Sequence, residues 1–171
     1  AEFCPQTSAA ALVENNEHLV VLRTMSKAWA AAGLRCGSVI AQPSVIDLLR
    51  RVIAPYPLPA PVVSLALAML EPPMLEQQRN MLEKIRLNKK YLLEILGRSE
   101  AVREIVPGEA NFVLIRVDEP NKLLTFCAQR NVILRGFPAD PALRGWVRIS
   151  VGSRSDLAQL EQALIEWETS Q

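Results

Sequence analysis

The chain has 171 residues, a formal net charge of +1 and a hydrophobic fraction of 50%. This is the composition of a globular protein with enough residues for a real core, not of a disordered or fibrous one. The near-neutral charge lacks the basic excess that nucleic acids attract, and no apolar run approaches the roughly 20 residues that span a bilayer, so we expect neither a nucleic-acid nor a membrane partner.

The N-terminal residues show no basic segment followed by an apolar stretch, so they do not read as a signal peptide. The cysteines, Cys4, Cys36 and Cys127, are widely spaced and form no metal-ligand pattern, so we expect no metal site and a reducing, cytoplasmic setting. The single histidine, His18, lies in a polar stretch. We interpret it as a surface residue, which disfavours nucleophilic mechanisms that need a histidine base.

The first part of the chain shows short runs of β-branched or helix-favouring residues separated by polar residues and glycine. They predict, in order, a strand at 19–23, a helix at 27–32, a strand at 37–41 and a helix at 44–54. Gly33 is expected to end the first helix and Ser44 to cap the second.

Prolines at alternate positions over 55–61 predict a stiff, extended connector, because no helix or central strand tolerates that pattern. An apolar helix is expected over 62–70, ended by the proline pair at 72–73. A long amphipathic helix is then predicted over 74–96, with Gly97 as its C-cap and its charges forming a solvated face.

The remaining residues change to shorter elements. Alternating or clustered apolar residues predict a strand at 112–117, a helix at 120–130, a strand at 132–137 and a strand at 146–151. Ser153 followed by Asp156 predicts a capping box that opens the last helix. The apolar spacing of that helix predicts a buried face made of Leu157, Leu160, Leu164 and Trp167.

These elements suggest three parts. We expect residues 1–73 to be a piece of a layered α/β domain and residues 98–171 to be a compact α+β domain. The helix over 74–97 links them.

The segment 22–37, LRTMSKAWAAAGLRCG, carries the most chemistry. Thr24 and Ser26 place hydroxyls at the end of a strand, Lys27 follows directly, and Arg35 lies eight residues further on. Hydroxyls, a helix start and an arginine suit a phosphate, and a lysine beside them can react with a phosphate-bearing aldehyde. The alternative is a surface lysine after a strand and an arginine in a salt bridge.

Two arginines interrupt otherwise apolar strands. In the run over 146–151, Val147, Ile149 and Val151 share one face, while Arg148 lies on the other. A guanidinium in mid-strand needs a planar anionic partner, either a substrate carboxylate or phosphate or an Asp or Glu of the same chain. The same two alternatives hold for Arg135 in VILRGF.

Five segments together resemble the fold-type I, pyridoxal-phosphate-dependent aminotransferases, and within them the histidinol-phosphate aminotransferase family. They are RTMSKAWAAAGLRCG (23–37), VIAPYPLPAPV (52–62), EANFVLIRV (109–117), NVILRGF (131–137) and WVRISVG (146–152). The EFCP element at 2–5 fits as well. The resemblance implies an α/β fold: the C-terminal part of the large, cofactor-binding domain followed by a small α+β domain.

The resemblance also implies residue roles and partners. Lys27 is the Schiff-base lysine and proton shuttle, with pyridoxal 5'-phosphate as cofactor. Its phosphate is held by Thr24, Ser26 and Arg35. The small-molecule substrate is bound by Arg148, by Arg135 as a second anion contact, and by Asn111. The family is dimeric, so a homodimer is expected.

In this family an aspartate that pairs with the pyridine nitrogen lies just before the part that reads EFCP. We therefore expect the chain to be the C-terminal part of an enzyme whose N-terminal half is a missing partner, and to be inefficient alone. The expected reaction passes an amino group between glutamate and imidazole-acetol phosphate, giving histidinol phosphate. The alternatives are another aminotransferase of this fold, acting on an aromatic or phosphorylated amino acid, and a non-catalytic globular fragment.

Overall fold

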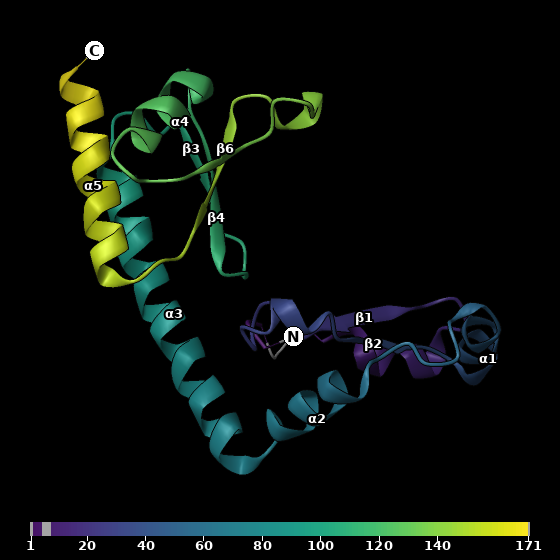
Figure 1. The fold of residues 1–171 in the computed structure, drawn as a ribbon. Coiled ribbons are helices and arrows are strands. Elements are labelled where there is room, and N and C mark those ends of the chain that lie inside the picture. Colours follow the sequence, from purple (N-terminus) through teal and green to yellow (C-terminus); the bar gives the residue numbers. More distant parts are fainter. Residues whose placement is uncertain (1, 5–7, 171) are drawn as a thin grey trace. The chain divides into compact units, whose positions relative to one another are not determined.

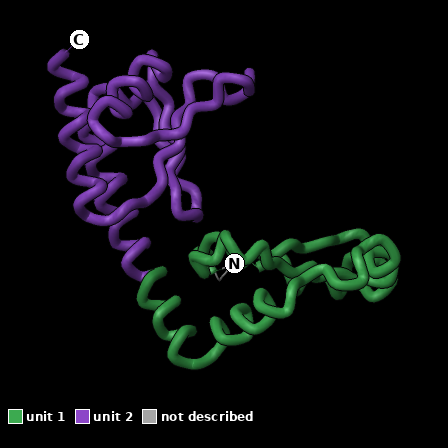
Figure 2. Tube along the Cα trace, viewed as in Figure 1, with its two compact units in different colours: residues 1–82 green, residues 83–171 purple. Residues whose placement is uncertain are grey.

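The computed structural model describes residues 2–4 and 8–170, so Pro5 of the EFCP element lies outside the described residues. The chain divides into two compact units, residues 1–82 and residues 83–171 (Figure 2). The division falls inside α3 (Pro72–Arg98), the long helix that the sequence predicts. Each unit is described by itself below, with its elements labelled as in Figure 1.

Unit 1 holds one antiparallel hairpin and several short helices. The hairpin consists of β1 (Val21–Thr24) and β2 (Gly37–Ile40), with Thr24 opposite Gly37 at the end where the loop joins the two strands. Both strands lie where the sequence predicts strands. The helical elements are η2 (Ala9–Asn15), η3 (Ala32–Leu34), α1 (Pro43–Val52), α2 (Ala60–Ala68) and the first turns of α3.

The helix predicted over 27–32 is absent. The backbone makes turns instead, with Ala30 N donating to Lys27 O at 3.0 Å and Ala31 N donating to Met25 O at 3.1 Å. Ala30 has a positive φ of 51°, which no right-handed helix accommodates. Six residues are too few to nucleate a helix by propensity alone, so the hairpin geometry decides the conformation.

The N-cap prediction at Ser44 is wrong as well. Helix α1 begins at Pro43, with Gln42 as the N-cap residue. Proline suits the first helical position because the backbone N–H that it lacks would have no partner within the helix there. The Gln42 amide instead donates to the backbone oxygens of Val13 and Glu14, at 2.7 and 2.9 Å. The side chain therefore ties α1 to η2.

The proline-rich connector is irregular up to Pro59, after which α2 begins two residues earlier than predicted. The pair Pro72–Pro73 opens α3 and does not merely end the helix before it. Gly97 does not cap this helix: the helix continues to Arg98, and Gly97 has no positive φ.

Unit 2 is an antiparallel four-stranded sheet in the order β3-β4-β6-β5, covered by helices (Figure 1). The strands are β3 (Glu104–Val106), β4 (Phe112–Arg116), β5 (Arg135–Gly136) and β6 (Trp146–Ser150). The helices are α4 (Pro120–Ala128), the short η4 (Pro141–Leu143), α5 (Arg154–Thr169) and the last turns of α3. Strand β3 was not predicted, and β5 is shorter than predicted.

Helix α5 begins as its sequence predicts. Ser153 and Asp156 form the full capping box, with Ser153 N donating to Asp156 Oδ2 at 2.8 Å and Asp156 N donating to Ser153 Oγ at 3.2 Å. These bonds satisfy backbone donors that a helix start otherwise leaves unpaired.

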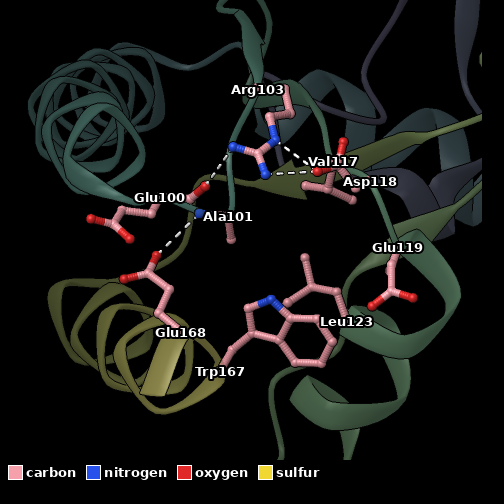
Figure 3. Close-up of a pocket in the computed structure, with 9 residues that line it drawn as sticks. All are labelled: Glu100, Ala101, Arg103, Val117, Asp118, Glu119, Leu123, Trp167 and Glu168. Atoms are coloured by element: carbon pink, nitrogen blue, oxygen red, sulfur yellow. Dashed lines mark hydrogen bonds and ion pairs between the residues drawn. The ribbon is translucent and has the colours of Figure 1, made fainter. Parts of the chain in front are cut away.

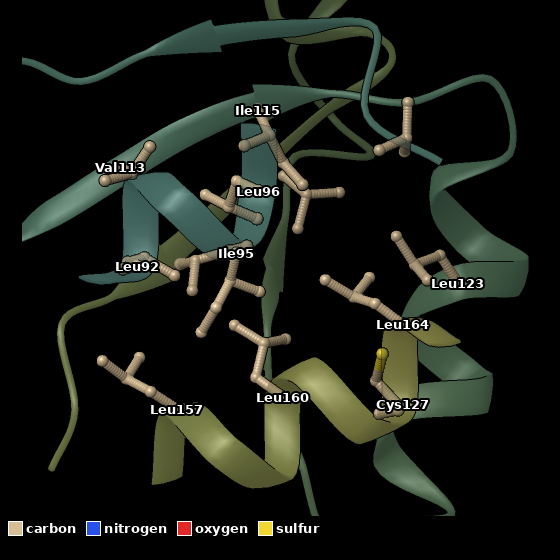
Figure 4. Close-up of a cluster of buried hydrophobic side chains, with 14 residues drawn as sticks. Leu92, Ile95, Leu96, Val113, Ile115, Leu123, Cys127, Leu157, Leu160 and Leu164 are labelled. Carbon is tan, nitrogen blue, oxygen red and sulfur yellow. The ribbon is translucent and has the colours of Figure 1, made fainter. Parts of the chain in front are cut away.

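The core of unit 2 lies between one face of the sheet and the helices (Figure 4). Val113 and Ile115 of β4 and Val147 and Ile149 of β6 are buried on that face. They pack with α3, α4 and α5 through Leu92, Ile95, Leu96, Leu123, Cys127, Leu157, Leu160, Ala163 and Leu164. The predicted face of α5 is thus confirmed, with Trp167 partly buried beside it. No helix among the described residues has the length and apolarity to cross a membrane.

Candidate functional site

The two predicted hydroxyls lie together at the loop end of the β1–β2 hairpin. Thr24 Oγ1 donates to Ser26 Oγ at 2.8 Å and accepts from Ser26 N at 3.1 Å. The bond holds the chain in a tight turn directly after the strand. The Ser26 hydroxyl proton has no acceptor among the described residues, so it can donate to an anion.

Lys27 follows this turn with an exposed side chain. Its backbone oxygen accepts the turn bond from Ala30, so the backbone of the lysine is fixed. Within the described ranges its ammonium group makes neither an ion pair nor a hydrogen bond. The amine is thus available for a reaction with a ligand.

Arg35 returns the chain toward the same end of the hairpin. It adopts the left-handed conformation, with φ 52° and ψ 34°, which is uncommon for a residue with a side chain. One guanidinium nitrogen, Nη1, donates to Ala32 O at 3.0 Å. No carboxylate of the described chain pairs with it, so the rest of the fork can bind an anion.

Position 37, at the start of β2, has no room for a side chain. A Cβ atom built on it would lie 2.8 Å from the backbone oxygen of Arg23, closer than side chains tolerate. A cavity of about 160 Å³ lies beside this contact, and Thr24, Trp29 and Cys36 line it. The hairpin thus presents a hollow as well as polar groups.

Unit 2 places the two predicted arginines on the sheet face opposite the core. Arg148 lies in the middle of β6, exposed, while its neighbours Val147 and Ile149 are buried. Arg135 of β5 is its direct cross-strand partner, and Leu114 of β4 is its partner on the other side. The two arginines therefore share one face and one row of the sheet.

Neither of these arginines forms an ion pair within the part of the chain that the structure describes. The Arg148 guanidinium lies over the Phe112 ring, 5.4 Å from its centroid. Other arginines of unit 2 do find carboxylates, including Arg98 with Glu161, Arg103 with Asp118 and Arg130 with Glu166. Like charges directly opposite each other in a sheet are destabilising, and an anion between them would offset the repulsion.

Asn111 lies directly before β4 and is half-buried. Its backbone oxygen accepts from Val151 N at 2.9 Å, which extends the β4–β6 pairing by one step. No described group hydrogen bonds to its side-chain amide, so the amide can bind a ligand.

The sequence pattern did not single out two residues of α3 whose side chains bind backbone oxygens at this end of the sheet. Lys89 Nζ of α3 donates to the backbone oxygens of Gly108 and Ala110 at 2.9 and 2.7 Å, and Asn88 Nδ2 donates to Gly152 O at 2.9 Å. Burial lowers the pKa of Lys89, and the charge of Glu109 partly offsets this. The expectation of a uniformly solvated charged face on this helix is therefore wrong at Lys89.

A separate cavity of about 230 Å³ in unit 2 contains none of the predicted site residues (Figure 3). Its polar groups are bound to one another: Arg103 pairs with Asp118 at 2.7 Å, and Glu168 accepts from Ala101 N at 3.3 Å. The Arg103 guanidinium lowers the pKa of Asp118 through their hydrogen bond. The residues described include no cluster of His, Cys, Asp or Glu that could hold a metal.

These features belong to a known class of protein. The family model for the class I and II aminotransferases matches residues 1–164, and the chain belongs to this family. More closely, the chain is 39% identical to the histidinol-phosphate aminotransferase of Citrobacter koseri over 163 residues, which cover 95% of this chain and 45% of that protein. The enzyme of the same name from Yersinia pseudotuberculosis is 37% identical, covering 95% of this chain and 43% of that one.

Solved structures show the same fold. The histidinol-phosphate aminotransferase of Clostridium acetobutylicum superposes with a TM-score of 0.85 at 20% identity, over 99% of this chain and 52% of that one. The enzyme of Sinorhizobium meliloti, solved with pyridoxal-5'-phosphate, gives 0.81 at 20% identity over 99% and 46%. The L-threonine-O-3-phosphate decarboxylase of Porphyromonas gingivalis gives 0.84 at 20% identity over 99% and 53%.

The fold class implied by the resemblance is confirmed: the chain corresponds to the C-terminal portion of an aminotransferase of this type. It spans less than half the length of the two curated relatives.

Proposed function

We propose that the protein containing this chain is a pyridoxal-phosphate-dependent aminotransferase of histidine biosynthesis. It would pass an amino group between glutamate and imidazole-acetol phosphate, giving histidinol phosphate. The observation that carries the proposal is the pair of cross-strand arginines, Arg135 and Arg148, neither of which pairs with a carboxylate of the described chain. The similarity to two histidinol-phosphate aminotransferases at 37–39% identity supports it. The activity is proposed for the whole protein, together with a cytoplasmic location and a homodimeric state.

The residues of unit 1 fit the cofactor. The paired hydroxyls of Thr24 and Ser26 and the open fork of Arg35 would bind its phosphate. When bound, pyridoxal phosphate supplies an aldehyde and an electron-withdrawing ring. Lys27 follows the phosphate-binding turn directly, so its amine would lie next to a ligand held there.

Lys27 would act through its Nζ atom. It would condense with the aldehyde of the bound cofactor, with water as the leaving group, and as a free amine it would accept a proton from the substrate α-carbon. It can then return the proton to a different carbon. A residue that is covalent partner and base in turn must be unpaired with carboxylates, as Lys27 is in the described chain.

The residues of unit 2 would bind the substrate. Arg148 and Arg135, side by side, would hold its anionic groups through charge-assisted hydrogen bonds, and the Asn111 amide would complete the pocket. Binding an anion also relieves the repulsion between the two guanidinium groups. The bound substrate would thereby be held in one orientation.

The cofactor assignment is tested by trapping. Pyridoxal phosphate and borohydride should attach a reduced label to the peptide that contains Lys27, together with a new absorbance band before reduction. Lys27→Ala should abolish both, whereas Lys90→Ala, an exposed lysine of α3, should keep them. A label on another lysine, or no label in the whole protein, would refute the assignment.

The substrate assignment is tested by kinetics. Arg148→Ala and Arg135→Ala should raise the KM for histidinol phosphate by about tenfold or more, because a charge-assisted bond worth about 1.5–3 kcal/mol is lost. Labelling at Lys27 should persist. Turnover of threonine phosphate or an aromatic amino acid in preference to histidinol phosphate would favour the alternative aminotransferases.

A further inference from the structure

Two adjacent residues of α3 bind the two loops at one end of the unit 2 sheet. Lys89 Nζ donates to Gly108 O and Ala110 O in the β3–β4 loop, and Asn88 Nδ2 donates to Gly152 O after β6. We call these two residues the α3 clamp. Since one helix turn holds both loops, their backbones are fixed to the same rigid support.

The two loops also bind each other. Val151 N donates to Asn111 O at 2.9 Å, one step beyond the pairing of Phe112 with Ser150. The clamp and this bond close a ring of hydrogen bonds that runs from α3 through one loop into the other and back to α3. Asn111 lies inside that ring, directly after the carbonyl that Lys89 binds.

The clamped end leads into the arginine row. Phe112 follows Asn111, and its ring lies under the Arg148 guanidinium. A shift of the β3–β4 loop would therefore move both the Asn111 amide and the aromatic support of Arg148. Gly108 has a φ of 53°, a left-handed conformation that glycine adopts without strain, so the loop turns sharply just before Asn111.

Lys89 is suited to this task and to little else. It makes no ion pair within the described ranges, and its charge is directed at two carbonyl oxygens. An ammonium donates to both at once, and such charge-assisted bonds are stronger than neutral ones. Its neighbour Lys90 is exposed and makes no such contact with the residues that the structure describes, so it offers a matched control.

We propose that Lys89, assisted by Asn88, is a positioning residue for substrate binding: it fixes the loop over 107–111 so that Asn111 and Arg148 are pre-set for the phosphate of the substrate. This inference rests on the proposed function, because that function assigns an anionic substrate to the arginines of this sheet. Positioning of this kind affects binding strongly, since small displacements of a site are costly.

The test compares Lys89→Met, Lys89→Gln and the matched control Lys90→Met in the holoenzyme. For Lys89→Met we expect the KM for histidinol phosphate and the Kd for inorganic phosphate to rise about tenfold, with kcat and the label at Lys27 nearly unchanged. Lys89→Gln, which keeps donors but loses the charge, should fall between Lys89→Met and wild type. Lys90→Met should match wild type.

A lower melting temperature with an unchanged KM and Kd in Lys89→Met would show a purely structural role and overturn the inference. If Lys89→Met does not fold, unchanged binding in Lys89→Gln and Asn88→Ala overturns it equally. Phosphate binding without turnover of histidinol phosphate in wild type would refute the proposed function alone, and the Kd comparison would still decide the role of Lys89. Absence of phosphate binding in wild type would overturn the inference too.

Discussion

The two compact units bury apolar residues very differently. Unit 2 places fourteen side chains in one continuous core, from Leu92 to Leu164 (Figure 4). In the described residues of unit 1, only Val13, Ala28, Ala31 and Leu82 are buried hydrophobics. Burial of apolar surface is the main favourable term in folding, so the stability of this chain measured alone resides in unit 2.

Unit 1 instead leaves large apolar side chains in solvent. Leu22 is 75% exposed, Val52 81% and Tyr56 92%. Exposed apolar surface at this density is typical of surfaces that associate. The residues proposed to react, around Lys27, therefore lie on the unit with little buried core. Those proposed to recognise the substrate lie on the unit with a continuous core of its own.

The largest expected effect comes from emptying the unit 2 core. Leu164→Ala should lower the free energy of unfolding by about 2–5 kcal/mol, because a fully buried leucine leaves a cavity. Leu65→Ala, in α2, should change it little since that side chain is 54% exposed. Urea unfolding followed by circular dichroism measures both. Equal losses would show that the two units share one cooperative core.

The rate at which a thiol reagent labels a cysteine should also differ between the two units. Burial raises the pKa of Cys127 to about 11, whereas Cys36 in unit 1 is only half-buried. Two pKa units above the usual value lower the thiolate fraction about a hundredfold. In chains that keep a single cysteine, a thiol reagent at pH 8 should therefore label Cys36 far faster than Cys127. Similar rates would mean that unit 2 opens readily.

Two glycines of unit 1 are expected to differ in their tolerance of an added methyl group. Gly37→Ala should disrupt the hairpin, at a cost of about 1–3 kcal/mol, because the new methyl group would overlap the Arg23 carbonyl. Gly33→Ala should be tolerated, since nothing lies within 4 Å of the added carbon. Amide hydrogen exchange of β1 and β2 reads out the difference. Unchanged protection in Gly37→Ala would show that the hairpin has room to widen.

The smallest effect concerns the helix starts. Ser153→Ala should destabilise unit 2 by about 1 kcal/mol through loss of the α5 cap. Ser44→Ala in unit 1 should have almost no effect, because Ser44 caps nothing there. Thermal unfolding of the two variants compares them directly, and a larger loss for Ser44→Ala would contradict the assigned start of α1.

The same cap has a pH dependence. Hydrogen bonds from the Ser153 side chain and backbone hold the pKa of Asp156 below its ordinary 3.8. The ionised carboxylate therefore stabilises the folded state above about pH 3.8, and this contribution is lost as the pH falls through the lower folded value. Unfolding between pH 5 and 2 should show this loss in wild type and not in Asp156→Asn.

The sequence predicted correctly those elements that are determined by residues close together in the chain. Ser153, Asp156 and the spacing of Leu157, Leu160 and Leu164 specify the start and buried face of α5 without help from the rest of the chain. Gly97 misled because a glycine ends a helix only where the chain turns left-handed, and here packing carries the helix past it. The run over 27–32 failed since the hairpin overrides its helix propensity.

The candidate site residues also differ in how far the sequence alone predicts their proximity. The proximity of Thr24 and Ser26 follows from two residues of separation, so sequence reasoning finds it. The row of Arg135 and Arg148 depends on the order β4-β6-β5, which no periodicity contains. Lys89 looked like any lysine on a charged helix, because its partners are backbone carbonyls about twenty residues away.

The arginine row has a consequence for how the protein responds to its solution. Two guanidinium groups on neighbouring strands are a local frustration in a sheet that is otherwise well satisfied. Any polyvalent anion that binds between them stabilises the folded state in proportion to the logarithm of its concentration. The choice of buffer salt is therefore an experimental variable: phosphate or sulfate should raise the melting temperature more than chloride at equal ionic strength.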